Sequence, residues 1–267
     1  DVLIVCGARF SDRVAGNRAK FSPNAEILHI DIDSAEMDKN IVSNYHLRGN
    51  LADVIPMLTR ELEQLDHSEW RNEIEGFKRP FVQLQIGDYV NPQAVIEAVD
   101  NKTPDDTIVV TDVGQHQLWA AQFYKYKLPH TLLTSGGLGT MGYSMGAAMG
   151  AAVGCPDKRV IMFVGDGGFH MNLTELATMA SYNIPVIMFV MNNTVLGMVR
   201  QWQKIFYNNR FSDTDPHRAT DFVKVAEAFG VKGMRIHTND EIDTVIDEAL
   251  KVNGPVLIEC RISPDSN

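Results

Sequence analysis

Two apolar stretches of the chain end in side chains that suit a metal site. Asp166, between two glycines, follows the apolar run at residues 159–164, and Asn193 follows another at residues 186–191. If these runs are neighbouring parallel strands, a carboxylate and an amide lie together at the carboxyl ends of the strands, where open α/β sheets bind ligands. Such oxygen ligands suit Mg²⁺, which usually keeps phosphate oxygens among its ligands. A simple strand-end turn is the structural alternative.

Three further segments would border the same edge of the sheet. They are the polar turn at residues 114–117, the glycine-rich loop at residues 135–142, and residues 196–202, which turn at a glycine into a helix. Glycines let backbone approach a ligand closely, and a helix N-terminus offers N–H groups to an anion. Together the segments favour a site for an anionic cofactor with a metal ion.

Each of these segments also has an ordinary structural explanation. His116 by itself would more often be a buried structural histidine, and Met141 by itself a core residue. Met198 and Trp202 are spaced i, i+4 and would pack on one face of a helix. The combination of segments, rather than any one of them, favours a binding site.

The bulk composition limits the class of protein. The chain has 267 residues, 45% of them hydrophobic, and a net charge of −10, which argues against nucleic acid or an anionic membrane as a partner. These residues contain no apolar run of membrane length, and we expect no signal peptide among them. Cys6, Cys155 and Cys260 lie far apart in apolar runs, so we expect buried, reduced thiols. The chain opens directly on an apolar strand, and we expect it to be a piece of a longer polypeptide.

Alternating strand and helix signals predict an α/β fold with a doubly wound parallel sheet over residues 91–267. Strands are expected at residues 107–112, 131–134, 159–164, 186–191, 232–236 and 256–260. Helices are expected at residues 92–101, 142–153, 172–183, 219–229 and 240–252. Asp240 is the expected N-cap of the last helix.

A second α/β unit is expected at residues 1–65, and a polar connector at residues 66–90. The first unit would contain a buried strand at Val2 to Cys6, a glycine turn with two arginines, a second strand and a helix. These elements are expected at residues 2–6, 7–16, 26–33 and 51–65.

Four stretches resemble the thiamine diphosphate enzymes, and most closely the catalytic large subunits of the acetohydroxyacid synthase branch, also called acetolactate synthases. The stretches are VGQHQLWAAQFYKYK, TSGGLGTMGYSMGAA, VGDGGFHMNLTEL and MNNTVLGMVRQWQKIFYNNRFS. The resemblance covers nearly the whole chain, and LGMVRQWQ is specific to this branch. It implies a thiamine diphosphate-binding domain preceded by part of a central flavin-binding domain.

The resemblance assigns roles to individual residues. Asp166, Asn193 and the carbonyl of Val195 match the Mg²⁺ ligands. Met141 matches an apolar wedge under the thiazolium ring, while Met198 and Trp202 match residues near the substrate. The expected cofactor-binding residues are Val113, Gly114, Gln115, His116, Gly139, Met141, Asp166, Gly167, Gly168, Asn193, Val195, Leu196, Gly197 and Met198.

The amino-terminal turn resembles the FAD-contacting turn of the biosynthetic enzymes. Two arginines on a glycine turn suit a diphosphate, and a salt-bridged surface loop is the alternative. The expected FAD residues are Gly7, Ala8, Arg9, Arg13, Val14, Asp31, Ile32, Gly49 and Asn50. The chain departs from the family at Ser11, where an acidic residue is common, and at Gly146, where proline is common.

For the parent protein, the resemblance implies decarboxylative condensation of pyruvate with pyruvate or 2-ketobutyrate. The products would be acetolactate or acetohydroxybutyrate, for isoleucine and valine synthesis. The family's pyrimidine-binding domain carries the activating glutamate and is not in this chain, so no catalytic residue is expected here. We therefore expect the chain alone to be inactive.

The resemblance further implies a homodimer or homotetramer, a small regulatory subunit, and a cytoplasmic or organellar location. Two alternatives stay open. One is another thiamine diphosphate enzyme, such as glyoxylate carboligase or pyruvate oxidase. The other is a non-catalytic assembly module that keeps the cofactor domain for dimerisation.

Overall fold

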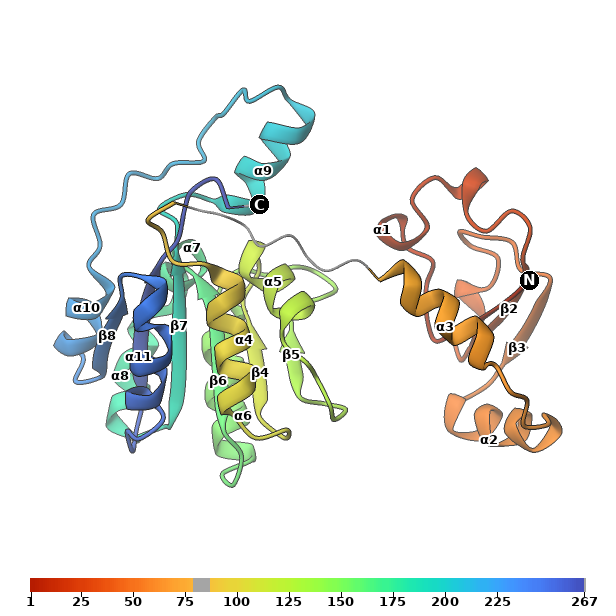
Figure 1. Ribbon diagram of the computed structural model, residues 1–267, viewed down its shortest axis with the longest axis horizontal. Coiled ribbons are helices and arrows are strands. Elements are labelled where there is room, and N and C mark those ends of the chain that lie inside the picture. The colour runs from red at the N-terminus through yellow and green to blue at the C-terminus, as the bar shows by residue number, and fades with distance from the viewer. Residues whose placement is uncertain (79–86, 267) are drawn as a thin grey trace. The chain divides into compact units, whose positions relative to one another are not determined.

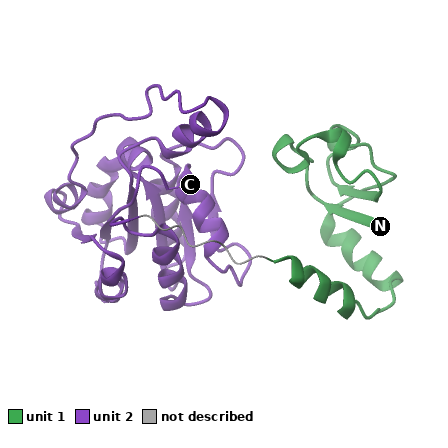
Figure 2. Ribbon diagram, turned by 45° about the horizontal axis from the view of Figure 1, so that its top comes forward, with its two compact units in different colours: residues 1–80 green, residues 81–267 purple. Residues whose placement is uncertain are grey.

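A computed structural model describes residues 1–78 and 87–266 of the chain (Figure 1). Contacts divide the chain into two compact units, residues 1–80 and residues 81–267 (Figure 2). Within the described ranges, no helix has both the length and the hydropathy needed to cross a bilayer.

The first unit contains a three-stranded parallel sheet in the order β1-β2-β3. Its elements are β1 (Val2–Cys6), α1 (Asp12–Ala15), β2 (Glu26–Asp31), β3 (Tyr45–Arg48), α2 (Leu51–Glu61) and α3 (Ser68–Phe77). A small core packs on one face of the sheet and consists of Phe10, Ala15, Ile27 and Ile41. The sequence reasoning missed β3.

The prediction that β1 is buried is wrong. Its side chains alternate between exposed and half-buried, with Val2 and Ile4 65% and 53% exposed, because the described residues cover only one face of this sheet. Cys6 is exposed for the same reason, and its predicted burial is also wrong. Cys260 is buried as predicted, while Cys155 is only half-buried.

The second unit is built on a six-stranded sheet in the order β5-β4-β6-β7-β9-β8, and every pairing is parallel. The strands are β4 (Ile108–Thr111), β5 (Leu132–Thr134), β6 (Val160–Gly165), β7 (Val186–Asn192), β8 (Lys232–Ile236) and β9 (Val256–Arg261). β6 and β7 pair from Val160 opposite Val186 to Gly165 opposite Met191. The two strands that precede Asp166 and Asn193 are therefore neighbours, as predicted.

Helices cover both faces of this sheet, which confirms the doubly wound fold (Figure 1). One face packs against α4 (Pro92–Lys102), α5 (Gln115–Phe123) and α11 (Ile242–Ala249). The other packs against α6 (Tyr143–Gly154), α7 (Asp166–Asn172), α8 (Leu176–Ser181) and α10 (Phe222–Ala228). Because both faces are covered, the central strands are continuous apolar runs.

Three details of the helices differ from the sequence reasoning. A polar turn was expected at residues 114–117, but the helix α5 begins at Gln115. The helix expected at residues 172–183 is not continuous. α7 runs from Asp166 to Asn172, a short 3-10 turn follows, and α8 begins at Leu176. Asp240 does not cap α11 and lies inside a 3-10 turn whose N-cap is Thr238. The 3-10 turn begins at Asn239, so Asp240 lies inside it and not at its N-cap position. The N-cap position of α11 is occupied by Glu241.

The predicted connector at residues 66–90 contains α3. Pro80, which suggested a connector, is one of residues 79–86, and these lie outside the described residues. The division of the chain into residues 1–65, 66–90 and 91–267 stays a prediction.

Candidate cofactor site

The chain direction across the sheet reverses at β4. From β4 the chain passes outward to β5 and then crosses back to β6 on the other side of β4. Parallel sheets bind ligands outside the carboxyl ends of their strands at such a switch point. The expected site residues follow β4, β6 and β7 at this edge.

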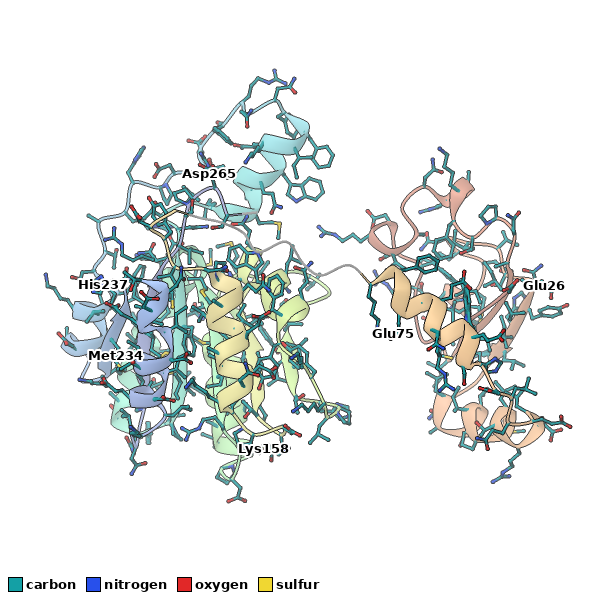
Figure 3. The ribbon with its side chains drawn as sticks, in the orientation of Figure 1. Glu26, Glu75, Lys158, Met234, His237 and Asp265 are labelled. Carbon is teal, nitrogen blue, oxygen red and sulfur yellow. The ribbon has the colours of Figure 1, made fainter. Side chains whose placement is uncertain are left out.

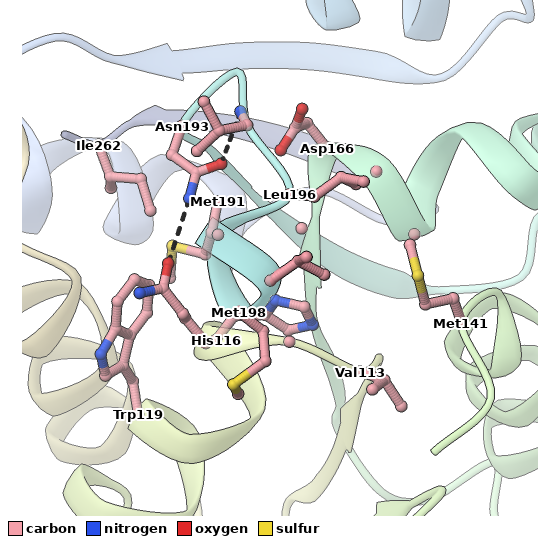
Figure 4. Close-up of a pocket in the computed structure, with 18 residues that line it drawn as sticks. Val113, His116, Trp119, Met141, Asp166, Met191, Asn193, Leu196, Met198 and Ile262 are labelled. Carbon is pink, nitrogen blue, oxygen red and sulfur yellow. Dashed lines mark hydrogen bonds between the residues drawn. The ribbon is translucent and has the colours of Figure 1, made fainter. Parts of the chain in front are cut away.

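A pocket at this edge brings together most of the residues expected to bind the cofactor (Figure 4). The expected residues that line it are Val113, Gly114, Gln115, His116, Met141, Asp166, Gly167, Gly168, Asn193, Val195, Leu196, Gly197 and Met198. Five lining residues were not expected, namely Trp119, Gly165, Met191, Val199 and Ile262. Trp119 could have been found from its i+4 spacing to Gln115 once α5 was recognised as a helix.

Two expected residues do not line the pocket. Gly139 lies in the loop before α6 with φ of +65°, next to Val113. Trp202 lies on α9 (Gly197–Phe206) and is 47% exposed, with its ring 5.0 Å from that of Phe206.

Asp166 is the first residue of α7, and its side chain is almost fully buried. Burial raises the pKa of the Asp166 carboxyl to about 6, against the opposing effects of the Arg218 guanidinium and of backbone N–H groups that include that of Asn193. The carboxylate therefore lies against the start of the turn after β7. The sequence reasoning missed Arg218, which follows no recognisable motif.

This buried carboxyl has a consequence for stability when no metal is bound. A pKa raised from 3.8 to about 6 means that the folded chain binds the proton more tightly than the unfolded chain. Asp166 therefore favours folding at low pH, and this contribution is lost as the pH rises from about 4 through 6. At ~1.4 kcal/mol per pKa unit, the loss is at most about 3 kcal/mol.

We expect Asp166→Asn to gain about 2 kcal/mol of stability relative to the parent chain as the pH rises from 4.5 to 7.5, since part of the total change already occurs below pH 4.5. Urea unfolding with a chelator present would measure this difference at each pH. The contributions of the other groups cancel in the comparison. A difference that does not change with pH would contradict the assignment.

Asn193 presents its side-chain oxygen beside this carboxylate. Its Nδ2 donates to Gln115 Oε1 at 3.3 Å, and its Oδ1 accepts from the Val195 N–H at 3.2 Å, as the dashed lines in Figure 4 show. An amide oxygen has two lone pairs, so one is left for a metal ion. Thr194, between Asn193 and Val195, has a left-handed backbone conformation with φ of +62°.

His116 supplies an unpaired polar atom in the pocket. The ring is 4% exposed, and its Nε2 has no hydrogen-bond partner. Burial lowers the pKa of His116 to about 4, against the opposing effect of Asp112, so the ring is neutral near pH 7. A buried polar atom without a partner is costly, and the ring that carries it lines the pocket.

Two glycines shape the backbone of the pocket. A Cβ on Gly168 would lie 2.3 Å from Asp112 Oδ1, and a Cβ on Gly197 would lie 2.1 Å from Gln115 Oε1. Asp112 in turn accepts hydrogen bonds from the N–H groups of Gly142 and Ser144, at 3.0 and 3.1 Å. This buried carboxylate thus joins the end of β4 to the starts of α6 and α7. The sequence reasoning did not single it out.

The residues present fit a magnesium diphosphate group. One buried carboxylate, one amide oxygen and one backbone carbonyl are hard oxygen ligands that leave places for phosphate and water. No group of three His, Cys, Asp or Glu residues in the described ranges could hold a metal ion, but this set has a single carboxylate and is of another kind. The glycine-lined backbone lets an anion approach closely, and the His116 ring lies in the same lining.

The first unit gathers part of the expected FAD set at the carboxyl ends of its strands. The Gly7 N–H donates to Ile30 O at 2.8 Å, and the Gly49 N–H donates to Asp31 O at 3.0 Å. Asn50 caps α2 through the N–H of Ala52.

Other members of the expected FAD set lie on the turn after β1 and on the surface. His29 and Asn40 donate to the carbonyls of Ala8 and Arg9, both at 3.0 Å. Arg13 and Val14 lie on α1, and Ile32 is exposed after β2. The binding of FAD here stays a prediction.

Fold and pocket together define a class of cofactor-binding enzymes. A family model for the C-terminal TPP binding domain of thiamine pyrophosphate enzymes matches residues 112–260. A second model, for the central domain of the same enzymes, matches residues 1–58. The chain belongs to the thiamine pyrophosphate enzyme family.

Within this family the chain is similar to acetolactate synthase large subunits. It is 43% identical over 276 residues to a probable acetolactate synthase large subunit from Methanocaldococcus jannaschii. The matched region covers 99% of this chain and 46% of that protein. It is 38% identical over 267 residues to the isozyme 2 large subunit of Escherichia coli, covering 100% of this chain and 48% of that protein. The chain spans about half the length of the curated relatives it matches.

Proposed function

We propose that this chain is the diphosphate-binding part of an acetolactate synthase catalytic subunit. The parent protein would join the two-carbon unit of pyruvate to a second pyruvate or to 2-ketobutyrate in branched-chain amino acid synthesis. The observation that carries the proposal is the convergence of Asp166, Asn193, Val195 and the His116 ring in one pocket. The similarity to acetolactate synthase large subunits supports it.

In this proposal Asp166, Asn193 and the Val195 carbonyl hold Mg²⁺. The diphosphate would contact Gly114, Gln115, His116, Gly139, Gly167, Gly168, Leu196 and Gly197. Thiamine diphosphate, when bound, supplies the carbon nucleophile and the electron sink for loss of CO₂.

The chain's own residues would position and shield this chemistry. His116 is neutral near pH 7, so its imidazole can offer an N–H to a phosphate oxygen without carrying a charge into the pocket. Met141, Leu196 and Met198 line the pocket with apolar side chains and would exclude water around the thiazolium ring. Met198 and Trp202 would contact the substrate.

Exposed apolar side chains support completion of the site by another domain. Leu138 is 95% exposed, and Phe206 and Trp202 on α9 are 62% and 47% exposed. Large exposed apolar groups of this kind mark interaction surfaces. We propose that the pyrimidine-binding domain of a second subunit covers them, in a homodimer or homotetramer.

The remaining proposals rest on the family resemblance of the sequence. FAD would bind the first unit as a group without a redox role, and a small regulatory subunit would join the catalytic subunit. The parent protein would work in the cytoplasm of a bacterium or in an organelle.

The test has two parts. Calorimetry of this chain with thiamine diphosphate, with and without Mg²⁺, should show saturable binding that requires the metal. The parent protein supplied with pyruvate should form acetolactate. Tartronate semialdehyde from glyoxylate, or acetyl phosphate from pyruvate, would show another member of the family. Binding without any turnover by the parent protein would favour an assembly module.

A further inference from the structure

A buried ion pair lies behind the turn that carries Asn193 and Val195. Glu259 on β9 is 3% exposed, and its Oε2 accepts from Arg235 of the neighbouring β8 at 2.7 Å. Arg235 also pairs with Asp221 at 2.7 Å. β9 lies between β7 and β8, and Glu259 stands in register with Val190 and with Arg235. A charged side chain inside an apolar strand needs partners for each of its polar atoms.

The second oxygen of Glu259 contacts the end of β7. Its Oε1 accepts from Asn192 Nδ2 at 2.7 Å. The other side of the same amide faces the turn, since Asn192 Oδ1 accepts from the Thr194 N–H at 3.1 Å. The Asn192 backbone is fixed as well, because its carbonyl accepts from the Ile262 N–H at 3.0 Å. A continuous set of contacts therefore runs from Arg235 to the Thr194 N–H.

The charge of Glu259 decides which way the Asn192 amide points. An ionised carboxylate only accepts hydrogen bonds, so the NH₂ group of Asn192 must face it. The amide oxygen then faces the Thr194 N–H, as the turn requires. If the amide were reversed, its NH₂ group would meet another N–H group and the turn would lose this bond.

The turn needs such support because its backbone is unfavourable. Thr194 has φ of +62°, and a β-branched residue in the left-handed region is strained. This conformation places Asn193 and Val195 on the pocket side of the turn. Strain of this kind persists only where the surrounding contacts hold it.

We propose that Glu259, fixed by Arg235, is a positioning residue that orients the Asn192 amide and so holds the turn at residues 192–195 ready to bind the metal. The metal part of this inference rests on the proposed function. Glu259 does not touch the pocket and acts only through Asn192.

The central variant is Glu259→Gln, which keeps the size of the side chain. A glutamine has one acceptor oxygen, and the guanidinium of Arg235, which only donates, would hold it. The NH₂ group of the glutamine would then face Asn192, so the Asn192 amide must turn over. The matched control is Asp221→Asn. It removes the other acidic partner of Arg235, keeps a side chain able to cap α10, and leaves the Glu259–Asn192 contact in place.

Hydrogen exchange without cofactor is the first measurement. We expect the Thr194 and Val195 amides to exchange about 10-fold faster or more in Glu259→Gln, with unchanged exchange in β6 and β7 and no effect in Asp221→Asn. Unchanged exchange at these two amides in Glu259→Gln would overturn the proposal. Equal effects of the two substitutions would overturn it too.

A second variant keeps the test decisive if Glu259→Gln does not fold. Asn192→Ala removes the amide without touching the ion pair and should speed exchange at Thr194 to the same degree. If Glu259→Gln does fold, the effects of the two substitutions should not add in the double variant, because they act through one contact. A stable turn in Asn192→Ala would overturn the proposal.

The metal is the second measurement. In calorimetry with saturating thiamine diphosphate, Glu259→Gln should need about 10-fold more Mg²⁺ for half-saturation, and Asp221→Asn should match the parent chain. Faster exchange at Thr194 and Val195 in Glu259→Gln, with the same Mg²⁺ concentration needed for half-saturation, would overturn the part of the proposal in which Glu259 supports metal binding. Failure of the unsubstituted chain to bind would count against the proposed function, while the exchange result still decides whether Glu259 holds the turn.

Discussion

Replacing Asp166 with asparagine is expected to abolish magnesium-dependent binding of thiamine diphosphate. Asp166 is the one carboxylate among the three proposed metal ligands, and an amide cannot supply its negative charge. We expect the affinity to fall by at least ~100-fold, which corresponds to about 2.7 kcal/mol. Calorimetric titration of the folded variant with Mg²⁺ and thiamine diphosphate measures this directly.

Asp105→Asn is a suitable control, because Asp105 is 62% exposed and forms a surface ion pair with Lys127. Binding by the parent chain should also weaken below pH 6, where the proton competes with the metal for Asp166, whose pKa is about 6. Metal-dependent binding by Asp166→Asn at the parental affinity would contradict the assignment of this ligand.

Gly168→Ala should cause the largest loss of stability among the small substitutions in the pocket. Its Cβ would lie 2.3 Å from the Asp112 carboxylate, which is itself fixed by Gly142 and Ser144. Neither α7 nor the carboxylate can move without breaking buried hydrogen bonds. We expect a loss of about 3 kcal/mol in the free energy of unfolding, at the upper end for overpacking.

Gly146→Ala is the matched control for this substitution. It lies inside α6, is exposed, and has nothing within 4 Å of its Cβ position. Alanine there should raise the free energy of unfolding by about 0.5 to 1 kcal/mol, since it favours the helix. Urea unfolding of both variants gives the comparison. A Gly168→Ala variant as stable as the parent would show that Asp112 can move away.

The sheet could be predicted from the sequence because its strands carry their signal locally. β6, β7 and β9 are apolar runs between polar turns, and both faces of each strand are covered. The pocket followed from them, because Asp166 and Asn193 come directly after neighbouring strands. α5 was missed because its first turn is polar and only later residues such as Trp119 face the core.

The ion pair behind the turn could not be found in the same way. Glu259 is 67 residues from Asn192 and 24 residues from Arg235, so its partners depend on the strand order. A glutamate inside the apolar run at residues 256–260 was the available signal, since a buried charge requires a partner. The burial of β1 was predicted from its apolar residues alone. The exposed fraction of its side chains depends instead on which other segments cover each face of the sheet, and the residues of β1 do not show this.

The order of the strands also has a consequence for synthesis of the chain. Among the strands of the described residues, β8 is at the sheet edge and pairs with β9, which occupies the place between β7 and β8. On the ribosome, β8 and α10 therefore emerge before any strand exists for them to join, and the edge of β7 stays unpaired until residue 261 is free. The contact between Asn192 and Glu259 then forms among the last. A chaperone that binds unpaired strand edges could therefore bind β7 during synthesis, until β9 has left the ribosome and paired with it.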